Sequence, residues 1–565
     1  MSRRRRRKSG QAAAKSTNAP AANRPGPADR PAPADRPAAA NRPLIARPVV
    51  RSPRLPVAKL GLATAAGAVL PLAFAPFDWF FVAPLSFALL LFVWRDETPW
   101  RAFGLGLAYG LASFFAGIHW VYISMHEFGA LHPAIALGMT GALVAVLALF
   151  PAATGAFAAA ARTTSGAFAW LGVMPALWVL TEWCRGWIFT GFGWLSAGYS
   201  QTESWLMAFA PVGGLHAMSW AVLLSAGALA AIVLGRRGER KAGFAVLAVI
   251  WGGAFVLADH GWTEPKGDTL GVALVQGAVP QELKWQPEEL DGILTLYREL
   301  TEQAAGSELI VWPEAAIPTL YDYVDGYLGD LEAWADARGS VVMLGILIGT
   351  PYDYTNSLIS LSEPEQVYTK RHLVPFGEYY PVPAFVRDWL RLMNLPYIDA
   401  EPGAAEPPPL EVAGERIAAT ICYEAVFGAE QLHYLPDATL LVNVSNDAWF
   451  GDSIAPHQHL QIARVRTAEA GRYMLRSTNT GITAVIDPRG RVVSRIPQFE
   501  PGILRDTVQG FTGPTPYARW GNYPVVLGAL LVAAAAAALA RKRGQSPFRA
   551  VKGSEPFSEG TSGPP

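Results

Sequence analysis

Long apolar stretches separated by short polar turns fill the first half of the chain, and one more lies near its end. A helix that crosses a bilayer needs about 20 mostly apolar residues. Eight stretches have roughly that length or more: 57–77, 79–95, 102–122, 133–161, 166–184, 208–235, 242–258 and 523–540. The pattern therefore predicts a membrane domain over 57–258 with seven transmembrane helices, and an eighth transmembrane helix over 523–540.

The segment between the seventh and eighth stretches, residues 259–522, has a different pattern. Short apolar runs, typical of buried strands, occur at 271–277, 308–314, 340–347, 416–424 and 438–447. They alternate with runs of helical period near 287–305, 325–337 and 456–476. Strands separated by such helices predict an α/β domain with helices packed on its sheets.

Composition agrees with a membrane protein that also carries soluble material, because 51% of the residues are hydrophobic and only 16% are charged. The formal net charge of +0 hides an uneven distribution, since residues 1–54 hold 14 Lys or Arg and 2 Asp or Glu. We predict disordered cytoplasmic tails over 1–54, which is rich in Ala, Pro and Arg, and over 541–565. A basic run also suits nucleic acid, but directly before an apolar stretch it favours a membrane anchor.

The positive charges of the short loops predict the orientation of the chain. With the first tail in the cytoplasm, the inner loops include 95–101, 235–241 and 541–544, which are rich in Lys and Arg. Seven crossings then deliver 259–522 to the outer face of the membrane. In a bacterium this face is the periplasmic side of the inner membrane.

Three residues with reactive side chains lie at the predicted ends of strands, where α/β domains often place their sites. Glu314 follows "LIVWP", Lys370 lies in "QVYTKRHLVPFGEYYP", and Cys422 ends "RIAATI". Together they can run acyl transfer: the carboxylate takes the thiol proton, the thiolate attacks a carbonyl, and the ammonium stabilises the oxyanion with a backbone N–H. The Tyr423 amide, directly after the cysteine, is the natural second donor.

Each of these residues also has a simpler explanation. A cysteine at the end of an apolar strand is often a small buried hydrophobe, a glutamate after proline can cap a helix, and a lysine in a loop can be a solvated charge. The second cysteine, Cys184, is interpreted as membrane packing. A Cys184–Cys422 disulfide is rejected because it would consume the nucleophile.

Several ordered motifs resemble the apolipoprotein N-acyltransferase family, whose members are integral membrane proteins of the carbon-nitrogen hydrolase (nitrilase) superfamily. The resemblance covers roughly residues 57–540 and rests on "AFAPFDW" (73–79), "TEWCRGWIFTGFGWLSAGYSQ" (181–201), "VQGAVPQELKW" (275–285), "VWPEAAIP" (311–318), "YTKRHLVPFGEYYP" (368–381), "ICYE" (421–424) and "NVSNDAWFG" (443–451). It implies an α-β-β-α sandwich for the outer domain.

The resemblance also implies roles for individual residues. Glu314 is the general base, Lys370 the cation that stabilises the oxyanion, and Cys422 the nucleophile. It implies supporting roles for five further residues: Trp285, Glu378, Tyr423, Glu424 and Trp194. Two of these have alternatives from the residues alone, because Glu378 also suits an ordinary surface carboxylate and Trp285 also suits core packing.

The activity that the resemblance implies is transfer of an acyl chain from a phospholipid, through a cysteine thioester, to the N-terminal amino group of the diacylglyceryl-cysteine of an apolipoprotein. Both partners are lipids held at the membrane, and neither a cofactor nor a metal is expected, because thioester exchange needs only a thiolate, a base and an oxyanion hole.

Three rival functions stay open at this point. A metallohydrolase would use "HQH" (457–459) with Asp447 or Asp452, although histidines two residues apart point to different sides of a helix. A non-catalytic scaffold or transporter would carry ionisable residues in the middle of its spans. A membrane-bound amidase or hydrolase of the nitrilase type would share the fold and the three reactive residues.

Overall fold

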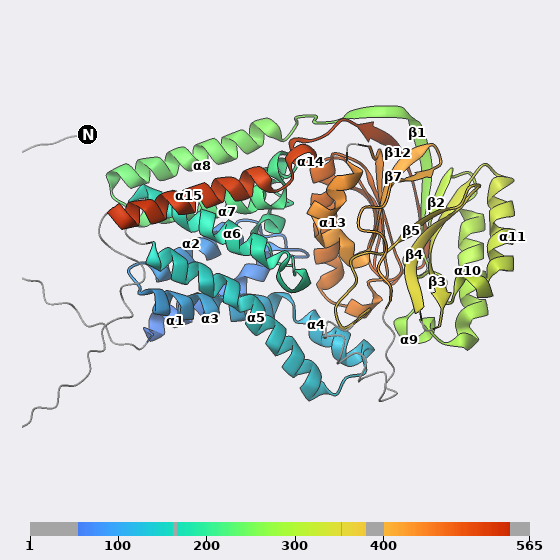
Figure 1. Cartoon of the computed structure of the whole chain (residues 1–565), viewed down its shortest axis with the longest axis horizontal. Helices are drawn as coiled ribbons and strands as arrows, with labels where there is room; N and C mark the ends of the chain where they lie inside the picture. Colours follow the sequence, from blue (N-terminus) through green and yellow to red (C-terminus); the bar gives the residue numbers. More distant parts are fainter. Residues whose placement is uncertain (1–54, 162–165, 352, 380–399, 436, 543–565) are drawn as a thin grey trace, which may run out of the picture. The chain divides into compact units, whose positions relative to one another are not determined.

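The structure is a computed structural model that describes residues 55–161, 166–351, 353–379, 400–435 and 437–542. The predicted tail over 1–54 and most of the one over 541–565 lie outside the described residues. Each of the eight predicted apolar spans contains a helix, as Figure 1 shows. These helices are α1 (Val57–Val69), α2 (Val82–Trp94), α3 (Pro99–Gly117), α5 (Pro133–Ala160), α6 (Met174–Arg185), α7 (Ala210–Leu234), α8 (Arg237–Leu257) and α15 (Tyr523–Lys542).

Length and apolar composition decide which of these helices can cross a membrane. Among the described residues, four helical segments pass on both counts: α5, α7 with the turn that precedes it, α8 and α15. A fifth passes if α3 and the following segment Trp120–Phe128, bent by 54°, form one broken span. Helices α1 and α2 are apolar but shorter. Several helices long and apolar enough to cross a membrane are therefore present, and the number eight stays a prediction.

Small residues let the membrane helices approach one another closely. A Cβ atom on Gly106 of α3 would lie 2.5 Å from the Pro151 carbonyl oxygen of α5, and one on Gly110 would lie 2.8 Å from the Ala148 Cα. In a lipid environment, where burial of apolar side chains gives little advantage, such close packing is a main source of helix association. The Gly- and Ala-rich sequence of these spans thus serves their packing.

The segment between α8 and α15 forms two sheets of six strands within the described residues. The first sheet has the order β12-β1-β2-β3-β4-β5, with bounds Gly502–Thr512, Glu264–Gln276, Leu309–Val311, Val341–Thr350, Asp353–Leu361 and Gln366–Thr369. The second has the order β11-β10-β9-β8-β7-β6, with bounds Val492–Ile496, Thr483–Ile486, Met474–Thr478, Leu440–Ser445, Glu415–Ile421 and Leu410–Val412. The strands β1, β2 and β3 are parallel, and so are β7, β8 and β9.

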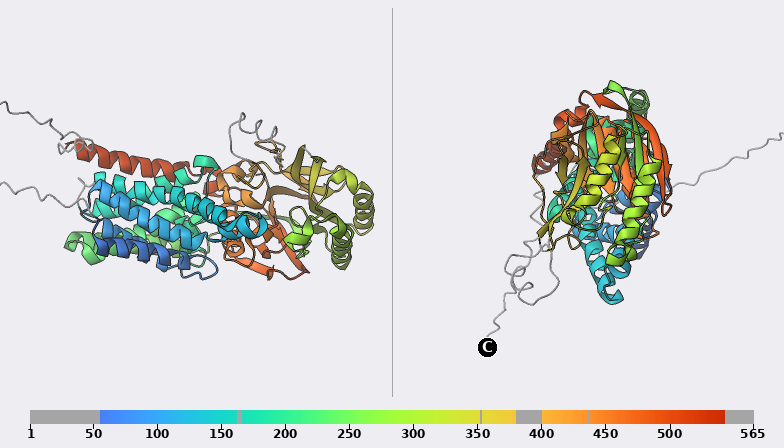
Figure 2. Two further views of the ribbon diagram at one scale, coloured as in Figure 1. Left: turned by 90° about the horizontal axis from the view of Figure 1, so that it is seen from below. Right: turned by 90° about the vertical axis from the view of Figure 1, so that its right-hand side faces the viewer.

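Helices cover the outer faces of the two sheets. Helices α10 (Leu290–Gln303) and α11 (Asp325–Asp336) lie beside the first sheet, and α13 (Ala455–Ala470) lies on the far side of the second, as Figure 1 and Figure 2 show. Apolar side chains from both sheets, among them Leu274, Val311 and Val442, form one buried cluster between them. The predicted α/β domain is therefore a four-layer sandwich.

The helix predicted over 456–476 ends earlier in the structure than the sequence pattern indicates. Helix α13 stops at Ala470 because Gly471 adopts a left-handed backbone with φ 65°, a common way to end a helix. The next residues turn back as β9, in which all five residues are buried. A buried strand with polar residues such as Arg476 and Ser477 lacks the apolar run that identifies strands in a sequence.

Candidate active site

The three predicted reactive residues follow strands of different sheets. Glu314 comes three residues after β2 and Lys370 directly after β5, both in the first sheet, whereas Cys422 comes directly after β7 in the second. The site is therefore assembled where the two sheets meet.

The Glu314 carboxylate is enclosed by hydrogen-bond donors. Its Oε1 atom accepts from Lys370 Nζ at 3.1 Å and from Asn356 Nδ2 at 2.8 Å, and its Oε2 atom accepts from the backbone N–H of Asn446 at 2.9 Å. Burial, with 6% of the residue exposed, favours a higher pKa, but Lys370 and these hydrogen bonds hold the pKa of Glu314 below its ordinary value. The group is thus ionised and able to accept a proton.

Lys370 is a buried cation between two carboxylates. Only 1% of it is exposed, and its Nζ lies 2.7 Å from Glu378 Oε1 as well as 3.1 Å from Glu314. Burial favours a lower pKa, but the charges of Glu314 and Glu378 raise the pKa of Lys370 well above its ordinary value. Glu378 is itself held by Asn356 Nδ2 and the Val374 N–H, so it pairs with Lys370 instead of standing in solvent.

Cys422 begins a short 3₁₀ helix (Cys422–Val426) with a left-handed backbone, φ 54°. A left-handed backbone at a residue other than glycine costs roughly 1–3 kcal/mol, and it persists only where the surrounding structure holds it. Burial and then the charge of Glu314 raise the pKa of the thiol, against the opposing effect of Lys370. The thiol is thus protonated in the resting site and needs a base to react.

Glu424 ties the two strand ends together. Its Oε2 atom accepts from the Ile421 N–H at 2.7 Å and from the Tyr368 hydroxyl at 2.7 Å, and its Oε1 atom accepts from the N–H groups of Arg371 and His372. The carboxylate thus bridges the turn that presents Cys422 and the segment that follows Lys370. This contact suits the supporting role that the family resemblance implies for Glu424.

Tyr423 joins the site to the helical part of the chain. Its hydroxyl donates to the Gly191 carbonyl at 2.8 Å, and its ring stacks on Trp194, with centroids 5.8 Å apart and planes 14° from parallel. Trp194 is buried, whereas Trp285, which follows α9 (Gln281–Lys284), is 46% exposed. Trp285 is therefore not a core residue, and it lies one residue from the buried Lys284.

Three residues of the site escaped the sequence analysis. Asn356 on β4 contacts both Glu314 and Glu378, and Asn446 follows β8 and holds Glu314 through its N–H. Lys284 donates to the Glu314 carbonyl at 3.2 Å and to Asn446 Oδ1 at 3.3 Å, and burial lowers its pKa to about 8. Only Asn446 carried a usable signal, because it ends an apolar run as Cys422 does.

Only part of the residue set of the metallohydrolase rival comes together, because the two histidines have different partners. His457 Nε2 lies 3.0 Å from Gln498 Nε2, whereas His459 Nδ1 lies 2.8 Å from Asp447 Oδ1. Across the described ranges, no group of three or more His, Cys, Asp or Glu side chains is arranged to hold a metal ion. The predicted divergence of the two histidines is thus confirmed.

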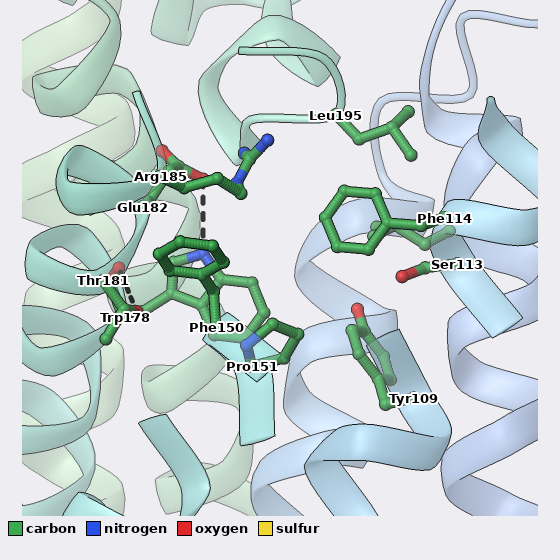
Figure 3. Close-up of a pocket in the computed structure, with 11 residues that line it drawn as sticks. Tyr109, Ser113, Phe114, Phe150, Pro151, Trp178, Thr181, Glu182, Arg185 and Leu195 are labelled. Atoms are coloured by element: carbon green, nitrogen blue, oxygen red, sulfur yellow. Dashed lines mark hydrogen bonds between the residues drawn. The ribbon is translucent and has the colours of Figure 1, made fainter. Parts of the chain in front are cut away.

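Ionisable residues do occur in the helical part, around a small pocket between α3, α5 and α6 (Figure 3). Its cavity of about 20 Å³ has room for about one water molecule. Glu182 and Arg185 line it but are bonded internally, since Glu182 accepts from the Ala197 N–H and Arg185 donates to the Phe192 and Trp194 carbonyls. Through these hydrogen bonds, Arg185 holds the loop that carries Trp194.

Comparison with known proteins gives matches to both parts of the chain. Residues 66–228 match the family described as apolipoprotein N-acyltransferase N-terminal domain, and residues 271–517 match the carbon-nitrogen hydrolase family. An apolipoprotein N-acyltransferase of Methylococcus capsulatus is 45% identical, with 82% of this chain and 93% of that protein covered. The enzyme of the same name from Nitrosomonas europaea is 44% identical, with 86% and 97% covered.

Solved structures match about half of the chain. One is a C145A mutant of a Nesterenkonia amidase from the nitrilase superfamily. It is 19% identical to this chain with a TM-score of 0.34, and the match covers 45% of this chain and 95% of the amidase. A carbon-nitrogen hydrolase superfamily protein from Xanthomonas campestris is 21% identical with a TM-score of 0.32, and covers 52% and 100%.

Proposed function

This chain belongs to the apolipoprotein N-acyltransferase family, and on that premise we propose that it transfers an acyl chain from a phospholipid to the α-amino group of the diacylglyceryl-cysteine that begins an apolipoprotein. The acyl chain travels as a thioester on Cys422. The observation that carries this mechanism is the ionised Glu314 carboxylate, which accepts a hydrogen bond from Lys370, while the charges of both groups act on the protonated Cys422 thiol.

In the first half-reaction Glu314 takes the proton of the Cys422 thiol, and the thiolate attacks the ester carbonyl carbon of the phospholipid. Lys370 and the Tyr423 N–H stabilise the oxyanion. When the tetrahedral intermediate collapses, the acyl C–O bond breaks, and the Glu314 carboxyl returns its proton to the alkoxide of the departing lysophospholipid.

In the second half-reaction the amino group of the acceptor attacks the thioester carbonyl. Glu314 accepts a proton from the attacking nitrogen, the C–S bond breaks, and the thiolate of Cys422 regains the proton. An amide has formed and the enzyme is restored, so no external oxidant, reductant or cofactor enters the balance. The exposed Trp285 is suited to cover the acyl group and to exclude water between the two steps.

The membrane arrangement that serves this chemistry has residues 57–258 as seven transmembrane helices, 259–522 as a periplasmic catalytic domain, and 523–540 as the eighth helix of a bacterial inner-membrane protein. Support comes from the apolar helices at these positions and from the basic inner loops. The bilayer then holds the catalytic domain beside both lipid substrates.

A reporter that is active only in the periplasm should work when it is fused after residue 300, and one that is active only in the cytoplasm should work when it is fused after Arg543. The expectation follows from the odd number of spans before the catalytic domain and the single span after it. Fusions in whole cells measure this directly. Reporters that place both points on one side of the membrane would contradict the eight-span arrangement.

The acyl transfer itself is tested by separating its two halves. Because both substrates use one cysteine in turn, lysophospholipid should appear before any acceptor is added, and the enzyme should then carry one acyl group on Cys422. After removal of free donor, the loaded enzyme should acylate a diacylglyceryl-cysteine peptide in a single turnover.

Two results would overturn this function. Release of lysophospholipid that requires the peptide would exclude the ping-pong order. Hydrolysis of the loaded enzyme to fatty acid at one rate with and without the peptide would favour the amidase or hydrolase alternative. A non-catalytic scaffold would give neither lysophospholipid nor a mass increase on Cys422.

A further inference from the structure

A buried cluster next to the nucleophile has no part in the reaction described above. His459 of α13 is 0% exposed, and its Nε2 atom lies 3.1 Å from the backbone carbonyl oxygen of Cys422. Its Nδ1 atom lies 2.8 Å from Asp447 Oδ1, and Asp447 Oδ2 accepts from Arg476 Nη2 at 2.8 Å. The cluster thus reaches from Arg476 to the peptide group of the nucleophile.

The contacts of His459 fix where its ring carries a proton. A carbonyl oxygen can only accept a hydrogen bond, so the contact with Cys422 requires a proton on Nε2. On the opposite side, Nδ1 faces Asp447 Oδ1 and lies 3.0 Å from Arg476 Nη2. With either arrangement of protons at Nδ1, the ring donates through Nε2 to the carbonyl of Cys422.

The cluster joins three neighbouring strands of the second sheet. Cys422 follows β7, Asp447 follows β8, and Arg476 lies within β9, and these strands are parallel neighbours. Burial favours a higher pKa for Asp447, but the charges of His459 and Arg476 lower it strongly, so its carboxylate stays ionised. Asp447 Oδ1 also accepts from the Ser445 hydroxyl at 2.7 Å.

The hydrogen bond from His459 acts on the peptide group that also contains the Tyr423 N–H. This peptide is trans, so its C=O and N–H point in opposite directions. Tyr423 is the second residue of its 3₁₀ helix, a position where the N–H has no partner within the helix. A donor that fixes the Cys422 carbonyl therefore fixes the direction of the Tyr423 N–H.

We propose that His459, held by Asp447 and Arg476, is a positioning residue that aims the Tyr423 N–H at the oxyanion. The proposal rests on the function proposed above, with Cys422 as the nucleophile. It also gives a reason for the left-handed backbone of Cys422, because the bond to His459 restrains a conformation that is costly by itself. Donation to the carbonyl polarises the peptide and makes its N–H a stronger donor.

Two reactions of the same thiol separate this role from a general effect on the fold. Formation of the thioester passes through an oxyanion, whereas alkylation of Cys422 by iodoacetamide is a displacement at carbon that has no oxyanion and depends on the thiolate. Both are measured on the full chain in detergent, in a Cys184→Ala background, because these are the two cysteines of the sequence. Burst release of lysophospholipid reports the first reaction, and mass spectrometry of labelled Cys422 reports the second.

Replacement of His459 by phenylalanine keeps an aromatic ring but removes the donor. We expect the burst to slow by about 10²-fold, as for loss of an oxyanion donor, while alkylation changes by less than about threefold. His459→Gln, which can still donate to the carbonyl, should keep the burst within about tenfold of the wild-type rate. The matched control is His457→Gln on the same helix, which should change neither reaction.

The proposal is overturned if the burst of His459→Phe is unchanged, or if burst and alkylation slow together, since His459 would then act on the thiol or on the fold. If His459→Phe gives no folded protein, His459→Gln decides, and a burst slowed as strongly as by loss of a donor refutes the proposal. A wild-type enzyme without burst or acyl-cysteine would instead refute the proposed function.

Discussion

Replacement of Glu314 by glutamine is expected to leave Cys422 without its acyl group. Burial and the Glu314 charge raise the pKa of the thiol, so at neutral pH the cysteine is protonated and requires a base. Glutamine fills the same space but cannot accept the proton, and loss of a general base typically costs about 10²–10⁴ in rate. The measurement is the mass of the intact protein after incubation with phospholipid.

The same experiment contains its own control, because the chain has a second cysteine. Cys184→Ala should acquire the acyl group at the wild-type rate, since Cys184 lies on α6 and belongs to no contact of the site described here. Normal acylation of Glu314→Gln would show that another group is the base. Loss of acylation in Cys184→Ala would show that the wrong cysteine has been assigned.

The sequence predicts the helical part well because a membrane span has a strong signal. Each apolar stretch contains a helix, yet the length of a stretch overstates that of the helix where the chain bends. The stretch 57–77, for example, contains α1 followed by a 3₁₀ turn that begins with Leu70 and Pro71. Local breaks of this kind depend on packing between helices, which periodicity does not report.

Strands of the catalytic domain are predicted only where they are apolar. The predicted runs correspond to β1, β2, β3, β7 and β8, which lie inside the sheets and each have at least one parallel neighbour. These runs are apolar because they are buried on both faces. The strands at or near the edges, such as β5 and β11, have mixed polarity and gave no clear signal. The missed strand β9 is central, but its polar residues serve the site instead of the core.

The candidate site shows the same division. Glu314 and Cys422 stand out because they follow apolar runs, and a strand end is a usable signal. Lys370 follows β5, whose polarity is mixed, and stands out only through the motif that surrounds it. Asn356 is different, since it lies inside β4 and becomes important only because the antiparallel pairing of β3, β4 and β5 places it beside Lys370. Contacts between strands far apart in the sequence cannot be obtained from periodicity alone.

The α/β domain and the helical part of the chain are in direct contact. The residue after Cys422, Tyr423, donates to Gly191 and stacks on Trp194. Farther along α13, Glu469 accepts from the backbone N–H of Leu215 at 2.7 Å, at the break in α7. The turn that presents Cys422 is therefore packed on loops of the helical part, so the helical part helps to shape the site.

The second large effect is expected from Lys370, whose loss should reduce both stability and activity. In Lys370→Met the carboxylates of Glu314 and Glu378 share Asn356 without the cation that lies between them, and breaking a buried ion pair typically costs about 3–5 kcal/mol. Loss of the oxyanion cation should also slow acylation by about 10²–10³-fold. Thermal unfolding in detergent and acylation of Cys422 measure the two effects separately.

Removal of the Glu378 charge separates the role of Lys370 in stability from its role in acylation. Lys370→Met combined with Glu378→Gln should regain most of the lost stability, because one uncompensated carboxylate and its repulsion with Glu314 are gone, but it should not regain acylation.

The loss of stability at low pH should be weaker in the single variant than in the wild type. In the wild type the pKa of Glu314 is below its unfolded value, so its contribution to stability is lost as the pH falls. Without Lys370, burial raises that pKa, the folded state binds more protons, and Lys370→Met should gain stability relative to the wild type as the pH falls. If the double variant recovers acylation together with stability, Lys370 is a structural partner of two carboxylates and the oxyanion needs another cation.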